Sequence, residues 1–314
     1  MRYGADDLLS HGIRYLAAGR GDTNAHHKLA WAVRGQRQIP LSIWDGVRSE
    51  LDASRETVNV ISSEALWFAD PAGVKNEIGE REDVRIVMYL RRQDKYLQSL
   101  YKQAVTSGRR TDFPTWLGEM SFRGDYLSVV RKWAEQFGDG AIVVRPYERA
   151  GKAVDTVSDF FQILGFDLQT VLPIRKHTGS NPSPRRELLD LIRAFNHVKL
   201  DIDYDAFFWS LIRRDPDFIR STDLLSFEEC EALMSQFEES NRMLSQTYYR
   251  DDETPLFPTL AAFSPPELWT PDQPEYFDML VNMMNAVVDT LSTEGIRRKP
   301  SKPSKMKPGK KTES

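Results

Sequence analysis

Three short runs of β-branched and other apolar residues constrain the fold of this chain more than any other feature of its sequence. They occupy residues 57–61 (TVNVI), 84–90 (VRIVMYL) and 141–144 (AIVV). Because each run is almost continuously apolar, it is typical of a strand covered on both faces, as in parallel sheets. Helical patterns follow or separate the runs, at 65–79, 94–107 and 125–137. This alternation predicts an α/β fold with a parallel β-sheet flanked by helices.

The second half of the sequence is dominated by helical patterns. Helices are predicted at 187–200, 226–249 and 276–291, with a Pro-rich irregular segment at 250–272. Ser226 followed by Glu229 predicts a capping box at the start of the second of these. A further short strand is a candidate at 40–43. We therefore expect a single domain over 1–296, with a parallel-sheet part at about 1–170 and a helical part at about 171–296.

Composition narrows the class of protein. The 314 residues are 40% hydrophobic and 28% charged, which is typical of a folded globular chain. The single cysteine, Cys230, excludes an intrachain disulfide and a cysteine-based zinc site. No apolar run has the length of a membrane helix or a signal core, so a cytoplasmic protein without a membrane span is expected.

The tail at 297–314 differs from the rest of the chain, since it carries eight Lys and Arg residues and one Glu. It is rich in Pro and Ser and has almost no apolar residues, so a disordered basic tail is expected. The tail contacts anionic lipid or RNA, or it is simply solvated; both alternatives stay open. Nothing in the sequence resembles a nucleic-acid-binding module.

Polar clusters follow all three predicted strands. They are Ser62-Ser63-Glu64, Arg91-Arg92-Gln93-Asp94 and Arg145-Pro146-Tyr147-Glu148. Ligands of parallel sheets bind at the carboxyl ends of strands, so one composite site is expected here. Arg91 ends its strand and Ser99 follows eight residues later, about two helical turns on. A guanidinium and a hydroxyl at this spacing suit a phosphate monoester, although an ion pair and a surface serine are the simpler alternative.

This stretch resembles the 3′-phosphate-binding motif of sulfotransferases that use 3′-phosphoadenosine 5′-phosphosulfate, with Arg91, Ser99 and Tyr101 at the motif positions. The chain as a whole resembles a bacterial sulfotransferase-like family over roughly residues 10–260. The markers, in order, are ISSE (61–64), YLRRQDKYLQSLYKQAV (89–105), DYLSVVRKWAEQFG (125–138), IVVRPYER (142–149), NPSPRRELLDLIRAFN (181–196) and FEESNRMLSQTY (237–248). The resemblance implies a fold like that of P-loop NTPases.

The resemblance also implies roles for further residues. Glu64 stands where such sulfotransferases place a catalytic base, although it is equally placed to cap the following helix. His26 and His27 stand where the family often has a histidine, which implies contact with the acceptor substrate, whereas a structural role is the alternative. Arg175 and Lys176 are candidates for the basic loop over the 3′-phosphate, with Arg185 and Arg186 as alternatives. No metal is implied.

One element of the family is missing from this sequence. The 5′-phosphosulfate loop, of the type Pro-Lys-x-Gly-Thr-Thr after the first strand, does not occur, and neither does Gly-x-x-x-x-Gly-Lys-Ser/Thr. The N-terminal strand that precedes the loop is missing as well. Either the natural chain extends upstream, or the protein is a paralogue without donor chemistry.

Two functions are therefore expected. The first is transfer of a sulfuryl group from 3′-phosphoadenosine 5′-phosphosulfate to a hydroxyl or amine of a small-molecule or glycan acceptor, which requires the upstream loop. The second is a non-catalytic protein of this fold that binds a nucleotide or serves as a scaffold. The sequence does not predict the acceptor or the oligomeric state.

Overall fold

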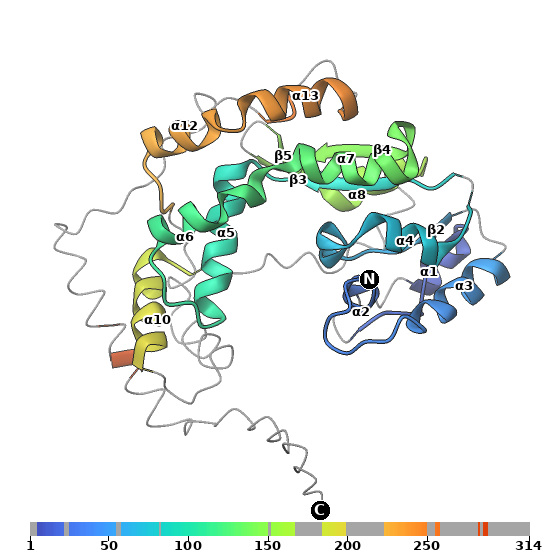
Figure 1. The fold of residues 1–314 in the computed structure, drawn as a ribbon, viewed down its shortest axis with the longest axis horizontal. Helices are drawn as coiled ribbons and strands as arrows, with labels where there is room; N and C mark the ends of the chain where they lie inside the picture. The colour runs from blue at the N-terminus through green and yellow to red at the C-terminus, as the bar shows by residue number, and fades with distance from the viewer. Residues whose placement is uncertain are drawn as a thin grey trace, which may run out of the picture. The chain divides into compact units, whose positions relative to one another are not determined.

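The computed structural model describes residues 5–21, 25–54, 58–81, 83–149, 152–166, 184–198, 223–249, 255–257, 282 and 285–287 (Figure 1). The chain divides into two compact units. The first contains residues 1–93, 123–180 and 233–263, and the second contains 94–122, 181–232 and 264–314. The single sulfotransferase-like domain expected over 1–296 stays a prediction.

The first unit contains two parallel strand pairs. β1 (Ile13–Tyr15) pairs with β2 (Val58–Val60), and β3 (Ile86–Leu90) pairs with β4 (Ile142–Pro146), both in parallel. The three predicted runs lie within these pairs, as β2, β3 and β4. A short antiparallel hairpin of β5 (Glu148–Arg149) and β6 (Lys152–Ala153) follows. The α/β class is therefore as expected, but among the described residues the sheet consists of separate two-stranded pairs.

Helices of the first unit surround these strands. They are α1 (Ala5–Ser10), α2 (His27–Val33), α3 (Ile43–Ala53), the 3-10 helix η2 (Glu64–Phe68), α4 (Pro71–Ile78), α7 (Tyr126–Phe137), the 3-10 helix η4 (Asp139–Ala141), α8 (Thr156–Ile163) and α13 (Glu238–Tyr248). The 3-10 helix η3 (Ser121–Gly124) leads into α7. Helix α7 buries Leu127, Val130 and Trp133 at helical spacing and packs against β4, α4 and α13.

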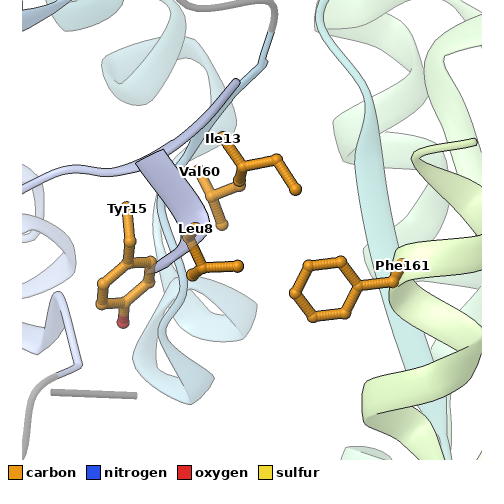
Figure 2. Packing of buried hydrophobic residues seen from close by; sticks show 5 residues of the cluster. All are labelled: Leu8, Ile13, Tyr15, Val60 and Phe161. Atoms are coloured by element: carbon orange, nitrogen blue, oxygen red, sulfur yellow. The ribbon is translucent and has the colours of Figure 1, made fainter. Parts of the chain in front are cut away.

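Helix α8 contacts both strand pairs. Phe161 is buried in an apolar cluster with Leu8 of α1, Ile13 and Tyr15 of β1 and Val60 of β2 (Figure 2). On the other side, the Asp159 carboxylate accepts a hydrogen bond of 2.7 Å from the Tyr89 hydroxyl of β3 and forms an ion pair of 3.6 Å with Arg145 of β4. Burial, followed by the bond to Asp159, raises the pKa of Tyr89.

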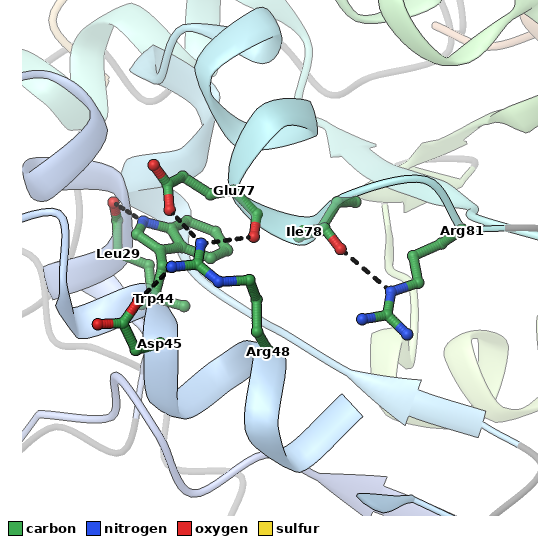
Figure 3. A network of polar contacts seen from close by, with 7 residues as sticks. All are labelled: Leu29, Trp44, Asp45, Arg48, Glu77, Ile78 and Arg81. Carbon is green, nitrogen blue, oxygen red and sulfur yellow. Dashed lines mark hydrogen bonds and ion pairs between the residues drawn. The ribbon is translucent and has the colours of Figure 1, made fainter. Parts of the chain in front are cut away.

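Helices α3 and α4 are joined by one arginine (Figure 3). Arg48 donates to the Glu77 carboxylate at 2.6 Å and to the Glu77 carbonyl at 3.0 Å, and it also pairs with Asp45. The Trp44 indole donates to the Leu29 carbonyl at 3.3 Å, which ties α3 to α2. The bond to Glu77, followed by the bond to Asp45, raises the pKa of Arg48.

The second unit contains most of α5 (Gln93–Thr106), with α6 (Phe113–Met120), α10 (Arg186–Val198) and the first part of α12 (Phe227–Ser235). The Asn196 amide donates to the carbonyls of Val105 and Arg109, both at 2.8 Å, and so fastens α10 to the end of α5. The Lys95 ammonium binds both oxygens of Asp223 at 2.7 Å. Helix α5 is thus the element on which this unit assembles.

Several predicted boundaries are wrong for identifiable reasons. Residues 41–42 form a turn, Pro40 has no regular structure, and α3 begins at Ile43, because Trp44 and Val47 are fully buried at helical spacing. The helix predicted at 65–79 is divided, since Asp70 caps a new helix whose first residue is Pro71. Helix α6 was not predicted.

The long helix predicted at 226–249 is also divided, into α12 and α13. Its capping box is confirmed: Ser226 Oγ accepts from the Glu229 N–H at 3.1 Å and Glu229 accepts from the Ser226 N–H at 2.7 Å. The break falls before Phe237, whose ring lies so close to Gly124 that a Cβ there would be 2.6 Å from it. Of the helix predicted at 276–291, only 282 and 285–287 are described, as helical; the segment 250–254, 258–272 and the tail 297–314 lie outside the described residues.

Candidate functional site

The carboxyl end of β2 carries the predicted base. Glu64 is the first residue of η2 and is exposed. Ser63 caps this short helix, because its hydroxyl accepts a hydrogen bond of 3.1 Å from the Ala65 N–H. Within the part of the chain that the structure describes, the Glu64 carboxylate has no hydrogen bond. The capping role weighed for Glu64 is thus filled by Ser63, and the carboxylate is open to solvent.

The two adjacent histidines have different environments. His26 is fully buried; its Nε2 donates to the Leu16 carbonyl at 2.9 Å, and its Nδ1 accepts from the Ser62 N–H at 3.1 Å. Burial lowers the pKa of His26, so the neutral imidazole ties the ends of β1 and β2 together. His27 is half-buried, and its Nδ1 lies 2.8 Å from Ser63 Oγ. The predicted contact of both histidines with an acceptor stays a prediction, and the placement of His26 favours the structural alternative.

Arg91 directly follows β3, beside the end of β4. Its Nε donates to the Glu148 carboxylate at 3.1 Å, and its guanidinium lies over the Tyr147 ring at 5.6 Å. The side chain of Arg91 remains 37% exposed, whereas that of Glu148 is 17% exposed. The register of β3 and β4 causes this grouping, because Leu90 is paired with Pro146 and the Tyr147 N–H donates to the Leu90 carbonyl at 2.7 Å. Part of the Arg91 guanidinium therefore remains accessible to a ligand.

Tyr126 connects the segments that follow β2 and β3. Its hydroxyl donates to the Arg91 carbonyl at 2.8 Å. Its ring meets the ring of Trp67 edge-on, with the centroids 5.5 Å apart. Because Trp67 lies in the same short helix as Glu64, Tyr126 links the segments that follow β2 and β3, and we call these segments together the strand-end site. It comprises Glu64, Arg91, Tyr126, Tyr147 and Glu148.

The remaining predicted site residues do not belong to the strand-end site. Ser99 is exposed on α5 and belongs to the second compact unit, whereas Arg91 belongs to the first. Tyr101 is buried, its hydroxyl donates to the Thr111 carbonyl at 3.0 Å, and burial raises its pKa to about 12. Arg175 and Lys176 lie outside the described residues, and Arg185 pairs with Glu187 at 3.4 Å.

A cavity of about 360 Å³ lies at the opposite end of the strands, before β3 and β4. Three basic side chains line it, and each binds a carbonyl near the C-terminus of a helix. Lys75 donates to Gln136 of α7 at 2.7 Å, Arg81 to Ile78 of α4 at 3.1 Å, and Arg85 to Ile163 of α8 at 3.4 Å. Because these cations offset the negative ends of helices, the cavity is not prepared for an anionic ligand.

The described residues contain no group of three or more His, Cys, Asp or Glu side chains arranged to hold a metal ion. Cys230 is buried, and burial together with Asp94 raises its pKa to about 12, so its thiol is not a reactive nucleophile. Among the helices that the structure describes, none combines the length and the apolar character needed to cross a membrane.

Sequence reasoning missed Tyr126 and the pairing of Arg91 with Glu148. Tyr126 opens one of the family-like markers, at 125–138, which was the available signal for it. Nothing in the local sequence indicates which carboxylate meets Arg91, since that depends on the register of β3 against β4.

Comparisons with known proteins add little to this geometry. An uncharacterized protein of Archaeoglobus fulgidus is 30% identical over 178 residues, which cover 52% of this chain and 46% of that protein. The chain thus matches less than half the length of this relative. No protein-family model matches the chain. No solved structure matches it either.

Proposed function

We propose that this chain binds the 3′-phosphate of a nucleotide sulfate donor at Arg91 and serves sulfuryl transfer to a hydroxyl or amine acceptor. The observation that supports this most is the half-exposed guanidinium of Arg91 at the carboxyl end of β3, connected through Tyr126 to the helix that starts at Glu64. A planar guanidinium binds a phosphate monoester through two parallel N–H bonds.

The chemistry is an in-line displacement at sulfur. The acceptor hydroxyl oxygen forms a bond to the sulfur of the donor while the bond from sulfur to the 5′-phosphate oxygen breaks. Glu64 takes the hydroxyl proton, and adenosine 3′,5′-bisphosphate leaves with the electron pair of the broken bond. Rate enhancement then comes mainly from positioning the two substrates and stabilising charge on the leaving oxygen.

The exposure of Glu64 and the lack of a hydrogen bond to its carboxylate among the described residues leave it available as a base. Ser99 belongs to the second compact unit, so the proposed binding step depends on Arg91 alone. The alternative function, nucleotide binding without catalysis, is favoured by one observation: the sequence contains no Pro-Lys-x-Gly-Thr-Thr loop.

Titration calorimetry with adenosine 3′,5′-bisphosphate tests the binding step. The wild-type chain should bind it more tightly than adenosine 5′-monophosphate, and Arg91→Ala should remove that preference. Arg242→Ala is the matched control, because this exposed arginine pairs with Glu239 of its own helix, α13, and not with a residue of the strand-end site. If the wild-type chain binds neither nucleotide, the proposal is wrong.

Transfer of a radioactive sulfuryl group from labelled donor to a mixture of hydroxyl acceptors separates the two functions. A catalytic chain should give labelled product that disappears in Glu64→Gln while nucleotide binding persists. Binding without any transfer would show that this chain alone does not catalyse the reaction.

A further inference from the structure

A second cavity lies in the second compact unit, at the turn that joins α5 to α6, and we call it the α5–α6 pocket. Its volume is about 560 Å³, which falls within the usual range of small-molecule sites. The residues that line it are Ala104, Ser107, Gly108, Arg109, Arg110 and Thr111. All six belong to the same unit. These described residues bring two cationic side chains and two hydroxyls to the pocket, and no carboxylate.

The backbone of this turn is closed by its own hydrogen bonds. Gly108 has a φ of +101°, and its N–H donates to the Val105 carbonyl at 2.9 Å. The Arg109 N–H donates to the Ala104 carbonyl, also at 2.9 Å. This is the Schellman arrangement, in which a glycine with positive φ ends a helix. Carbonyls near the end of α5 thus have backbone donors and do not need arginine side chains.

Three side chains fix the backbone that follows. The carbonyls of residues 109, 110 and 111 accept hydrogen bonds from Asn196 at 2.8 Å, His197 at 3.2 Å and Tyr101 at 3.0 Å, in that order. Asn196 and His197 lie on α10, and Tyr101 lies on α5. Because three consecutive carbonyls are held, the backbone from which the two arginines extend is fixed before a ligand binds. Such preorganisation lowers the entropy cost of binding.

Both guanidiniums remain unused within the part of the chain that the structure describes. Arg109 and Arg110 are exposed, and neither side chain has a hydrogen bond or an ion pair there. The neighbouring carboxylate, Asp112, accepts from the Thr115 N–H at 2.9 Å and so caps α6; this bond lowers the pKa of Asp112. The cations at the amino end of β3 and β4 differ, since each of them binds a helix carbonyl.

We propose that the α5–α6 pocket binds the phosphate monoester of a small organic molecule, such as a sugar phosphate. Each planar guanidinium can donate two parallel N–H bonds to phosphate oxygens, and the two positive charges balance those of the dianion. The hydroxyls of Ser107 and Thr111 supply further donors in the same turn. The pocket is larger than one inorganic oxyanion, which leaves room for the organic part of the ligand. The site involves neither Arg91 nor Glu64 and is independent of the proposed sulfuryl transfer.

Titration calorimetry of the full chain with glucose 6-phosphate tests the site, with glucose and inorganic phosphate as comparison ligands. Glucose 6-phosphate should bind more tightly than either, because only it supplies both the dianion and the sugar. The double variant Arg109→Gln with Arg110→Gln should lose at least about tenfold in affinity for it, since charge-assisted hydrogen bonds are removed. Arg109→Lys with Arg110→Lys keeps the charges without the planar forks and should recover part of that loss.

The matched control is Arg131→Gln with Lys132→Gln. It removes two adjacent exposed cations from α7 and changes the net charge by the same amount. This control should bind glucose 6-phosphate like the wild type. Because both arginines of the pocket are exposed, their glutamine variant should keep the thermal unfolding midpoint of the wild type, which separates lost binding from a folding defect.

Four results would overturn the proposal. The wild-type chain does not bind glucose 6-phosphate, or the glutamine variant of the pocket binds it like the wild type. The control variant loses as much affinity, which would assign the effect to net charge, or inorganic phosphate binds equally well, which would show that no organic part is recognised. Arg91→Ala should leave this affinity unchanged. A loss confined to that variant would place the phosphate at the strand-end site and so support the proposed function while disproving the pocket.

Discussion

The two ends of the β3–β4 pair use arginine and lysine in different ways. At the amino end, Lys75, Arg81 and Arg85 each bind a carbonyl at the end of a helix and line the cavity of about 360 Å³. At the carboxyl end, Arg91 uses only its Nε for Glu148 and keeps part of its side chain in solvent. The comparison teaches that a cavity lined by cationic side chains is not by itself an anion-binding site. It is one only if those side chains do not already bind other groups of the protein.

The largest expected effect concerns the apolar contact that holds the β1–β2 pair to helix α8. Phe161→Ala should lower the free energy of unfolding by about 3–5 kcal/mol, since it removes a ring that is 5% exposed from the cluster with β1 and β2. Urea unfolding followed by tryptophan fluorescence measures this. Phe160→Ala, at a partly buried neighbouring position, should cost less; equal losses would contradict the packing described.

A smaller effect is expected at Tyr126, which belongs to the carboxyl end. Tyr126→Phe keeps the ring against Trp67 but leaves the Arg91 carbonyl without this donor, which should cost about 1 kcal/mol of stability. It should also weaken binding of adenosine 3′,5′-bisphosphate, because Arg91 is then less well positioned. Unchanged nucleotide affinity would show that the hydroxyl serves stability alone.

At the amino end, Lys75→Met should reduce stability by about 0.3–1 kcal/mol through loss of the cation at the C-terminus of α7. Nucleotide affinity should stay at the wild-type value, in contrast to Arg91→Ala. A drop in affinity in this variant would mean that the cavity, rather than the strand ends, takes the anion. Thermal unfolding and calorimetry on the same sample give both quantities.

The last prediction concerns the pH dependence of stability that arises from His26, which links the ends of β1 and β2. Burial lowers the pKa of His26 in the folded state, so the unfolded chain binds more protons between that lowered pKa and about 6.5. The contribution of His26 to stability is therefore complete above about pH 6.5 and declines as the pH falls below it. Urea midpoints at pH 7.5 and 5.5 test this. The difference between the two should shrink in His26→Gln; an equal difference would assign the slope to other groups.

Much of the local structure could be predicted, because it depends on short-range patterns. The runs around Val60, Met88 and Val144 are strands, and Ser226 with Glu229 forms the capping box. The division before Phe237 was not predicted; in the fold the Phe237 ring packs directly on Gly124, which lies far away in the sequence. The candidate site shows the same limit. Arg91 stands out because it ends a strand, whereas its pairing with Glu148 depends on the register of β3 against β4, which requires the folded chain.

Helix α8 is attached to its two neighbours by unlike forces. Its contact with β3 and β4 runs through the Asp159 carboxylate, and hydrogen bonds have strict distance and angle requirements. Its contact with β1 and β2 is the apolar packing of Phe161, which is not directional. Small sliding movements at the second contact are therefore cheaper than at the first. The β1–β2 pair, which leads to Glu64, can therefore shift against α8 more easily than the β3–β4 pair, which leads to Arg91.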